Sequence, residues 1–407
     1  MKHFIAYGNS DQESFRSEDV LRALDYLTVP GTIASYYPDA TAAFVLSSRI
    51  DYVIDPRTPL FQGKVDPPKA SHFSLADWHG PTVRQYMGSD VDRLPVQFSA
   101  ALYTSATVTE MVDCVIRRQR EYGGRAETMA ASILDRYRKL SAKVEGRPEG
   151  EAPGESKSPS FLLAPYFVRV DEDWKTVNKA ILAVASARED SRSISPVLAV
   201  NSPAGLLDAF SDLSPRLSQT VFFWIDGFKE RSESKELLSE LWGVVSGCPS
   251  TVSLINLYGG FFSICLAFAG LWGFNNGLGY SESRDWPQLP ATGAAPPRYY
   301  ISRLHAFLPP GAAQLVVTTQ PSFACSCPVC AEQLPASLTY HGLKKHFAFA
   351  RRAEIDFVSA STRDQVATDL VVTADEFDDQ VARRLPRGVP HVGTDHLRRW
   401  ASVLGGA

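Results

Sequence analysis

Apolar segments of strand length recur along this chain of 407 residues, and segments with a helical pattern separate most of them. Several of the apolar segments lack polar alternation, which is typical of strands that are buried on both faces. Strands and helices that alternate at this spacing predict a parallel sheet, and eight such strands favour a closed (β/α)8 barrel over an open sheet. We therefore expect an α/β protein built on a TIM barrel.

The expected elements can be placed by residue number. A short N-terminal strand is expected at residues 3–7, followed by an amphipathic helix at 18–27. The eight expected barrel strands are residues 31–36, 51–54, 94–99, 161–167, 195–200, 220–225, 251–257 and 271–274. The expected intervening helices are residues 108–122, 174–187, 203–213 and 235–246.

Three cysteines lie within six residues, in the stretch Cys325-Ser-Cys327-Pro-Val-Cys330. Thiols this close together cannot pair off neatly as disulfides, but they can bind one metal ion. Zinc takes four ligands in a tetrahedron and suits thiolate and imidazole. A helix expected from residue 340 offers the fourth ligand, and His346 is favoured over His341 because the longer excursion lets the helix fold back over the cysteines. The alternative is three incidental buried thiols.

Composition divides the chain into regions. Residues 141–160 carry almost no apolar side chains, so we expect a flexible surface insertion within a barrel that spans residues 1–310. The cysteines place a zinc-binding subdomain at residues 311–361. Residues 362–407 are expected to form C-terminal helices.

Charge and cysteine content restrict the classes of function. The net charge of −4 leaves no global basic field, so any contact with nucleic acid must come from a local patch. The apolar run at residues 252–274 is broken by glycine and asparagine, which favours buried strands over a membrane span. With no signal peptide, the scattered remaining cysteines fit a reducing cytoplasm. Candidate basic groups are Arg298, Arg303, Lys344, Lys345, Arg351 and Arg352.

In a parallel barrel the active site lies at the C-terminal ends of the strands. Asp55 and Asp226 each follow a wholly apolar strand. Burial there penalises a charge unless the carboxylate is solvated or has a functional role. The alternative is that each caps a helix or braces a loop. Glycines at strand ends would let the backbone approach a flat ligand closely. The candidate substrate contacts at these strand ends are Gln62, Asn201, Tyr258, Gly259, Gly260 and Asn275.

The cysteine motif, with a helical histidine after the last barrel strand, resembles the zinc subdomain of the tRNA-guanine transglycosylases (queuine tRNA-ribosyltransferases). The archaeal members carry a near-identical Cys-Ser-Cys-Pro-Val-Cys. The segment Asp55-Pro-Arg-Thr-Pro-Leu-Phe-Gln62 also resembles the family's Asp-Ser-Gly-Gly-Phe-Gln, whose aspartate is the general acid/base. The resemblance covers roughly residues 30 to 360, and only these two motifs are specific. It implies a structural zinc ion and an acid/base role for Asp55.

The chain also departs from the family's pattern. The family's nucleophilic aspartate follows the last barrel strand, and alignment on Phe274 puts Asn275 there, with no Pro-Thr-Arg motif after it. An amide cannot replace a carboxylate as nucleophile, so Glu282 and Asp226 are the nearest candidates, unless the covalent step is lost. The family's Gly-Gly is replaced by Pro-Arg57. This divergence looks more like the paralogues that insert 7-deazaguanine bases into DNA.

Exchange of a base at C1′ needs one carboxylate on the sugar face and a second to handle the proton of the base. The target base must leave the stack, so aromatic walls are expected, and Trp224, Tyr258 and Tyr280 either supply them or are plain core aromatics. We therefore expect an enzyme that exchanges guanine for a 7-deazaguanine base in nucleic acid, with DNA favoured over tRNA. The alternatives are an N-glycosidic hydrolase on the same scaffold and a catalytically silent nucleic-acid-binding subunit. A homodimer or a partner subunit is left open.

Overall fold

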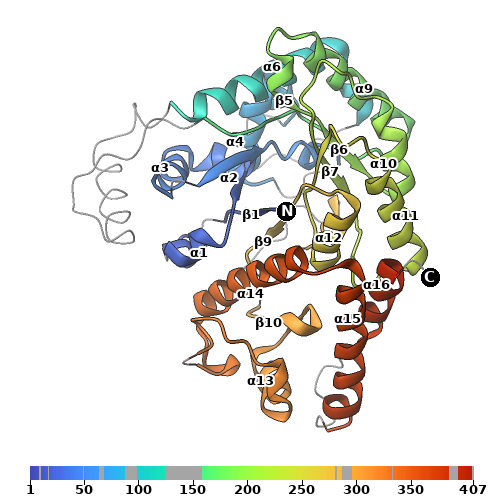
Figure 1. Ribbon diagram of the computed structural model, residues 1–407. Helices are drawn as coiled ribbons and strands as arrows, with labels where there is room; N and C mark the ends of the chain where they lie inside the picture. The colour runs from blue at the N-terminus through green and yellow to red at the C-terminus, as the bar shows by residue number, and fades with distance from the viewer. Residues whose placement is uncertain are drawn as a thin grey trace.

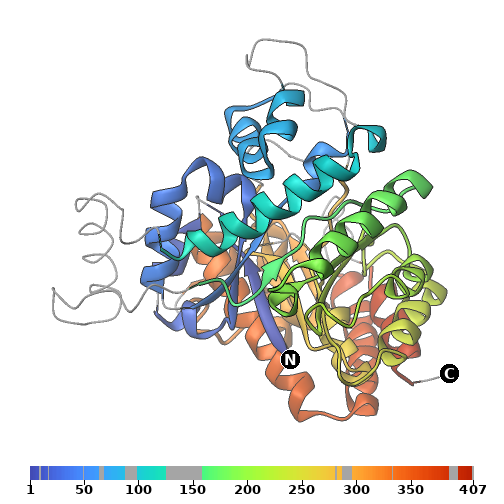
Figure 2. The same ribbon diagram turned by 90° about the horizontal axis from the view of Figure 1, so that it is seen from above.

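A curled parallel sheet of seven strands lies at the centre of the molecule, with helices around it (Figures 1 and 2). The computed structural model describes residues 1–8, 11–16, 18–48, 50–63, 68–87, 99–124, 158–279, 282–286, 296–331, 333–384 and 393–405. In spatial order the strands are β3 (Asp51–Asp55), β2 (Tyr26–Pro30), β1 (Lys2–Ala6), β9 (Gly273–Gly277), β8 (Ser253–Asn256), β7 (Thr220–Ile225) and β6 (Val197–Val200).

One further segment touches both edges of this sheet. Phe161 forms a parallel bridge with Val53 in edge strand β3, and Val168 forms one with Ala199 in the other edge strand, β6. Between these bridges, β4 (Leu162–Leu163) pairs in parallel with β5 (Ile194–Ser195), which runs into β6 after a proline. The fold is thus an α/β fold whose parallel sheet curls into at least a half-barrel.

The interior of the curl is apolar at its centre. Phe4 of β1 stacks on Tyr26 of β2 with ring centroids 4.4 Å apart and meets Phe222 of β7 edge-on. Val53 of β3 and Ile255 of β8 belong to the same buried cluster. These strands are buried because side chains cover both faces, which explains their lack of polar alternation.

Helices follow most of the strands and pack on the outside of the sheet. The helices of this part are α1 (Glu18–Arg22), α2 (Gly31–Tyr36), α3 (Pro38–Ser48), α4 (Ala70–His79), α5 (Pro81–Met87), α6 (Ser105–Tyr122), α9 (Glu172–Ala187), α10 (Pro203–Phe210), α11 (Lys235–Ser246) and α12 (Phe261–Cys265). No described helix is both long and apolar enough to cross a membrane.

The C-terminal part continues from an antiparallel hairpin of β10 (Tyr299–Ile301) and β11 (Ala306–Leu308). In Figure 1 the long helix α14 lies between the sheet and the hairpin. The helices of this part are α13 (Pro310–Thr319), α14 (Tyr340–Ala360), α15 (Arg363–Phe377) and α16 (Asp395–Gly405). Trp400 of α16 packs on Phe261 and Phe262 of α12, so the C-terminal helices share a core with the sheet region.

The structure confirms most of the predicted elements and corrects two. The strand predicted at residues 31–36 is the helix α2, and the true strand β2 lies just before it, partly within the helix predicted at 18–27. The strand at residues 3–7 is β1, which lies inside the sheet between β2 and β9. Residues 94–98 and most of the predicted insertion, residues 141–157, lie outside the described residues.

Candidate functional site

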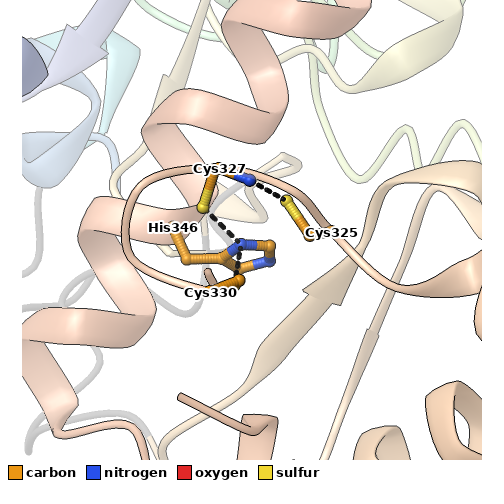
Figure 3. A group of neighbouring side chains, drawn as sticks. All are labelled: Cys325, Cys327, Cys330 and His346. Carbon is orange, nitrogen blue, oxygen red and sulfur yellow. Dashed lines mark hydrogen bonds between the residues drawn. The ribbon is translucent and has the colours of Figure 1, made fainter. Parts of the chain in front are cut away.

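The three clustered cysteines and His346 converge in the C-terminal part (Figure 3). The cysteines lie on the loop between α13 and α14, where the amide of Cys330 donates to the carbonyl of Cys327 over 2.9 Å in a tight turn. Their sulfur atoms and the imidazole ligand nitrogen all lie within 4.8 Å of one another. A set of three thiols and one imidazole at this spacing could hold a metal ion.

The imidazole of His346 is fixed by contacts on its other side. Its Nε2 donates to the carbonyl of Tyr300 over 2.7 Å, and its Nδ1 faces the sulfur atoms, 3.2 Å from that of Cys330. The ring of Tyr299 stacks on the imidazole with centroids 4.1 Å apart. Metal-bound histidines usually donate their second nitrogen in this way. His341, the alternative ligand, instead contacts Ser14 over 3.0 Å.

Hydrogen bonds within the cluster shift the pKa values of its members in opposite directions, and those with Cys325 and Cys327 raise the pKa of Cys330. Hydrogen bonds from Cys325 and Cys330 hold the pKa of Cys327 far below its usual range. Burial opposes protonation of His346, but hydrogen bonds with Cys325 and Cys327 outweigh it and raise its pKa to about 9. Thiolate and neutral imidazole are the forms that ligate metals, so a cation would displace protons from the cluster, and it is the geometry that suits one.

A second group of polar residues lies where the strands of the sheet end, and we call this place the mouth. Asp55, the last residue of β3, has a side chain that is only 2% exposed. The hydroxyl of Tyr166 donates to Asp55 Oδ1 over 2.7 Å, and the backbone amide of Arg57 donates to the same oxygen over 3.0 Å. The guanidinium Nε of Arg57 lies 2.7 Å from Oδ2. The Asp55 carboxylate is therefore paired and held in a fixed orientation.

Arg57 adopts an unusual backbone conformation to make these contacts. Its φ of 56° and ψ of 29° lie in the left-handed region, which side-chain-bearing residues rarely enter. The resemblance noted above aligns this position with a glycine, the residue for which the conformation carries no penalty. Strain of this kind persists where surrounding contacts fix it, and the buried pair with Asp55 supplies such a contact.

Aromatic side chains line the mouth beside Asp55. Tyr166 meets Trp224 edge-on with centroids 6.4 Å apart, and Trp224 meets Tyr258 in the same way at 5.3 Å. All three side chains are buried. Trp224 and Tyr258 were expected as aromatic walls, and they do lie together; Tyr280 lies outside the described residues.

Residues 282–286, which we call the strap, cross the mouth after β9. The carbonyl of Arg284 accepts hydrogen bonds from the amide of Gly227 and from Trp224 Nε1, over 2.9 and 3.3 Å. The amide of Trp286 donates to Asp226 Oδ1 over 2.8 Å, and the Trp286 ring lies against Gly63. The strap therefore ties the segment after β9 to the end of β7.

Glu282, at the start of the strap, belongs to a buried ionic network. Its carboxylate pairs with Arg351 of α14, which also pairs with Glu354 over 2.8 Å. A Cβ on Gly260 would lie 2.8 Å from Glu230 Oε2 and 2.9 Å from Glu282 Oε2, so both carboxylates approach this glycine. Burial raises the pKa of Glu282 to about 7, although Arg351 opposes the shift.

The three candidate catalytic carboxylates have separate partners. Asp55 is held by Arg57 and Tyr166, Glu282 by Arg351, and Asp226 by the amide of Trp286. Burial raises the pKa of Asp226 as well. The structure therefore does not bring two of these carboxylates into one hydrogen-bonded pair, although the strap carries Glu282 and contacts Asp226.

The candidate substrate contacts divide into two kinds. Gln62 exchanges two hydrogen bonds with the backbone of Val168, at 2.6 and 2.8 Å, and so braces the segment after β4. Asn201 is exposed at the end of β6. Asn275 donates from Nδ2 to the carbonyl of Leu257 over 2.8 Å, while its buried Oδ1 has no hydrogen-bond partner among the described residues. Of these three, only Asn275 combines burial with an unused acceptor.

Packing explains both glycines after β8. A Cβ on Gly259 would lie 2.3 Å from Ser263 Oγ, which is closer than any real contact. Gly260 is confined by the two carboxylates described above. Both positions therefore exclude a side chain for reasons internal to the protein, whatever ligand the mouth takes.

Most of the candidate basic groups are already paired. Lys344 is buried and pairs with Asp11, and Arg351 is fully buried between two glutamates. Arg303 pairs with Glu376 over 2.9 Å, and Arg352 lies 3.0 Å from Asp356. The expected basic patch beside the cysteines is therefore largely a set of structural ion pairs, and Lys345 and Arg298 are what remain of it.

Three residues of the mouth were not anticipated: Tyr166, Arg284 and Trp286. Tyr166 lies within the strand predicted at residues 161–167, so the strand-end criterion passed over it, whereas β4 in fact ends at Leu163. The two strap residues carry no such signal, because their position depends on how the loop after β9 folds back. No known protein family and no curated protein matches this chain, so only its own residues bear on its function.

Proposed function

We propose that the sheet closes into an eight-stranded barrel and that the cysteine–histidine cluster binds one structural zinc ion. The parallel bridges of Phe161 and Val168 to the two edge strands support closure, with β4 as the fourth strand and β5 continuing into β6 as the fifth. Four protein ligands would fill a tetrahedral zinc site and leave no open position for catalysis.

We propose that the protein is a transglycosylase that exchanges guanine for a 7-deazaguanine base in nucleic acid, DNA rather than tRNA. The observation that carries this proposal is the buried Asp55, held by Arg57 and Tyr166 beside Trp224 and Tyr258. A paired carboxylate with aromatic walls, at the C-terminal ends of parallel strands, suits proton transfer to a stacked base. Glu282 and Asp226 remain the candidates for a nucleophile.

Release of labelled guanine tests this function directly. DNA and, separately, tRNA carrying radiolabelled guanine are incubated with the protein, with and without a 7-deazaguanine base. We expect release that depends on the added base and on DNA, and none with Asp55→Asn, whose amide is nearly isosteric. Release without incorporation of the added base would instead identify a hydrolase. Wild-type exchange by Asp55→Asn would refute the proposed role of Asp55.

A catalytically silent nucleic-acid-binding subunit is the second candidate function. It is favoured by Asn275, whose amide is bonded to Leu257 where the resemblance implies a nucleophilic carboxylate. The near-complete burial of Asp55 points the same way. A trapped covalent adduct with nucleic acid, lost in Glu282→Gln or in Asp226→Asn, would exclude this candidate and name the nucleophile.

A further inference from the structure

The mouth contains a guanidinium group for which the described residues supply no ion pair. Arg284 lies on the strap with its guanidinium carbon 5.7 Å from the centroid of the Tyr258 ring. Its Nε is buried and has no hydrogen-bond partner, and no ion pair of this side chain is found within the described part of the chain. Arg351, by contrast, is fully buried and pairs with two glutamates.

The charges that act most strongly on Arg284 are those of Arg57 and Asp55. These two residues are paired with each other, so together they offer Arg284 no net counter-charge. Burial lowers the pKa of Arg284, and repulsion from Arg57 adds to the effect. A buried charge without a counter-charge destabilises the folded protein, so such a group is retained where something outside the protein neutralises it.

The position of Arg284 also suits an anion. The strap follows β9, the last strand of the sheet, and loops after the last strands of parallel barrels frequently bind phosphate groups. Arginine presents several N–H donors in one plane, which matches phosphate oxygens. Tyr258 and Trp224 are the aromatic rings nearest to a flat group attached to that phosphate.

We infer that Arg284 is the anion-binding residue of the mouth and that it takes the phosphate of a nucleotide whose base lies toward Tyr258. This inference rests on the proposed function for the identity of the base, but the positive charge of Arg284 calls for an anionic ligand in either case. Arg284 is then a specificity-determining residue, which selects a phosphate-bearing nucleotide over a free base or nucleoside.

Calorimetric titration of the full-length protein with matched ligands tests the inference. Guanosine 5′-monophosphate, guanosine and inorganic phosphate are each titrated into the wild type, Arg284→Gln and Arg284→Lys. We expect the wild type to bind the monophosphate at least about tenfold more tightly than guanosine, the size of one charge-assisted hydrogen bond. Arg284→Gln should lose this preference, Arg284→Lys should keep most of it, and inorganic phosphate should compete only where the charge is present.

Arg383→Gln is the matched control, because Arg383 is an exposed arginine in the C-terminal part and should keep the wild-type preference. Equal binding of monophosphate and guanosine by the wild type would overturn the inference. Tighter binding of guanosine by Arg284→Gln would also overturn the inference, because the arginine side chain would then obstruct the site and not bind the phosphate. If base exchange fails while the preference for the monophosphate is observed, the proposed transglycosylase function is refuted and the proposed anion site is supported.

Discussion

Replacement of Arg57 by glycine changes the stability of the folded protein in two opposing ways. Glycine adopts the left-handed conformation freely, so the variant should regain about 1–2 kcal/mol of backbone strain. It also removes one partner of a buried ion pair, which typically costs about 3–5 kcal/mol. Asp55 keeps the hydrogen bonds from Tyr166 and from the backbone amide of residue 57, so the loss should lie near the lower value. We expect Arg57→Gly to be less stable than the wild type by about 2 kcal/mol.

Urea unfolding followed by circular dichroism measures this difference, and two further variants isolate its parts. Arg57→Ala loses the ion pair and keeps the strain, so it should unfold at lower urea concentration than Arg57→Gly. In an Asp55→Asn background the charge to be neutralised is gone, and the cost of Arg57→Gly should shrink or change sign. An Arg57→Gly protein as stable as the wild type would refute the claim that Asp55 depends on Arg57. Equal stability of the alanine and glycine variants would refute the strain.

Three other predictions concern the metal cluster, the ionic network and the glycines. Cys327→Ser should lose the one bound zinc ion per chain, measured by metal analysis, together with soluble expression, because binding free energy is folding free energy at such a site; full zinc content in this variant would exclude the cluster. Because the pKa of Glu282 is raised to about 7 from 4.5, the folded protein binds more protons than the unfolded chain between these values, and stability falls as pH rises through them. Glu282→Gln should flatten that slope in urea unfolding series, and an unchanged slope would show that other groups cause it. Gly259→Ala should destabilise by about 1–3 kcal/mol because its Cβ would collide with Ser263, and a neutral effect in thermal unfolding would contradict the packing.

The buried strands could be predicted because a continuous run of apolar residues is stable in a strand that is covered on both faces. The segment of β7, for example, spans residues 220–225 in both the prediction and the structure. The error at residues 31–36 has a local cause. Pro30 ends β2, and Gly31 begins a helix at a point where a Cβ would lie 2.9 Å from the carbonyl oxygen of Asp55. The β-branched residues after Gly31 suggest a strand, but this close approach of the two backbones decides the outcome.

The metal cluster could be predicted because three of its residues lie within six positions of the chain and the fourth lies on the next helix. Local spacing alone therefore brings the donors together. The choice of His346 over His341 rested on the length of the excursion, and the contacts of Tyr300 and Ser14 now give it a physical reason. The basic patch could not be predicted in the same way, because a run of charges in the sequence does not show which of them pair with residues of distant segments.

The mouth depends on residues from distant segments, and this is why the sequence alone places Asp55 there but not its surroundings. Asp55 ends a strand, and strand ends meet at one edge of a parallel sheet whatever the loops do. Arg57 stands where the motif that the chain resembles has a glycine. In the structure its side chain pairs with Asp55, while its backbone adopts the strained left-handed conformation. That pairing neutralises Asp55 from within the protein, so the pair offers Arg284 no net counter-charge. In our proposal, the substitution that distinguishes this chain from the motif it resembles is therefore also what leaves Arg284 to bind an anion.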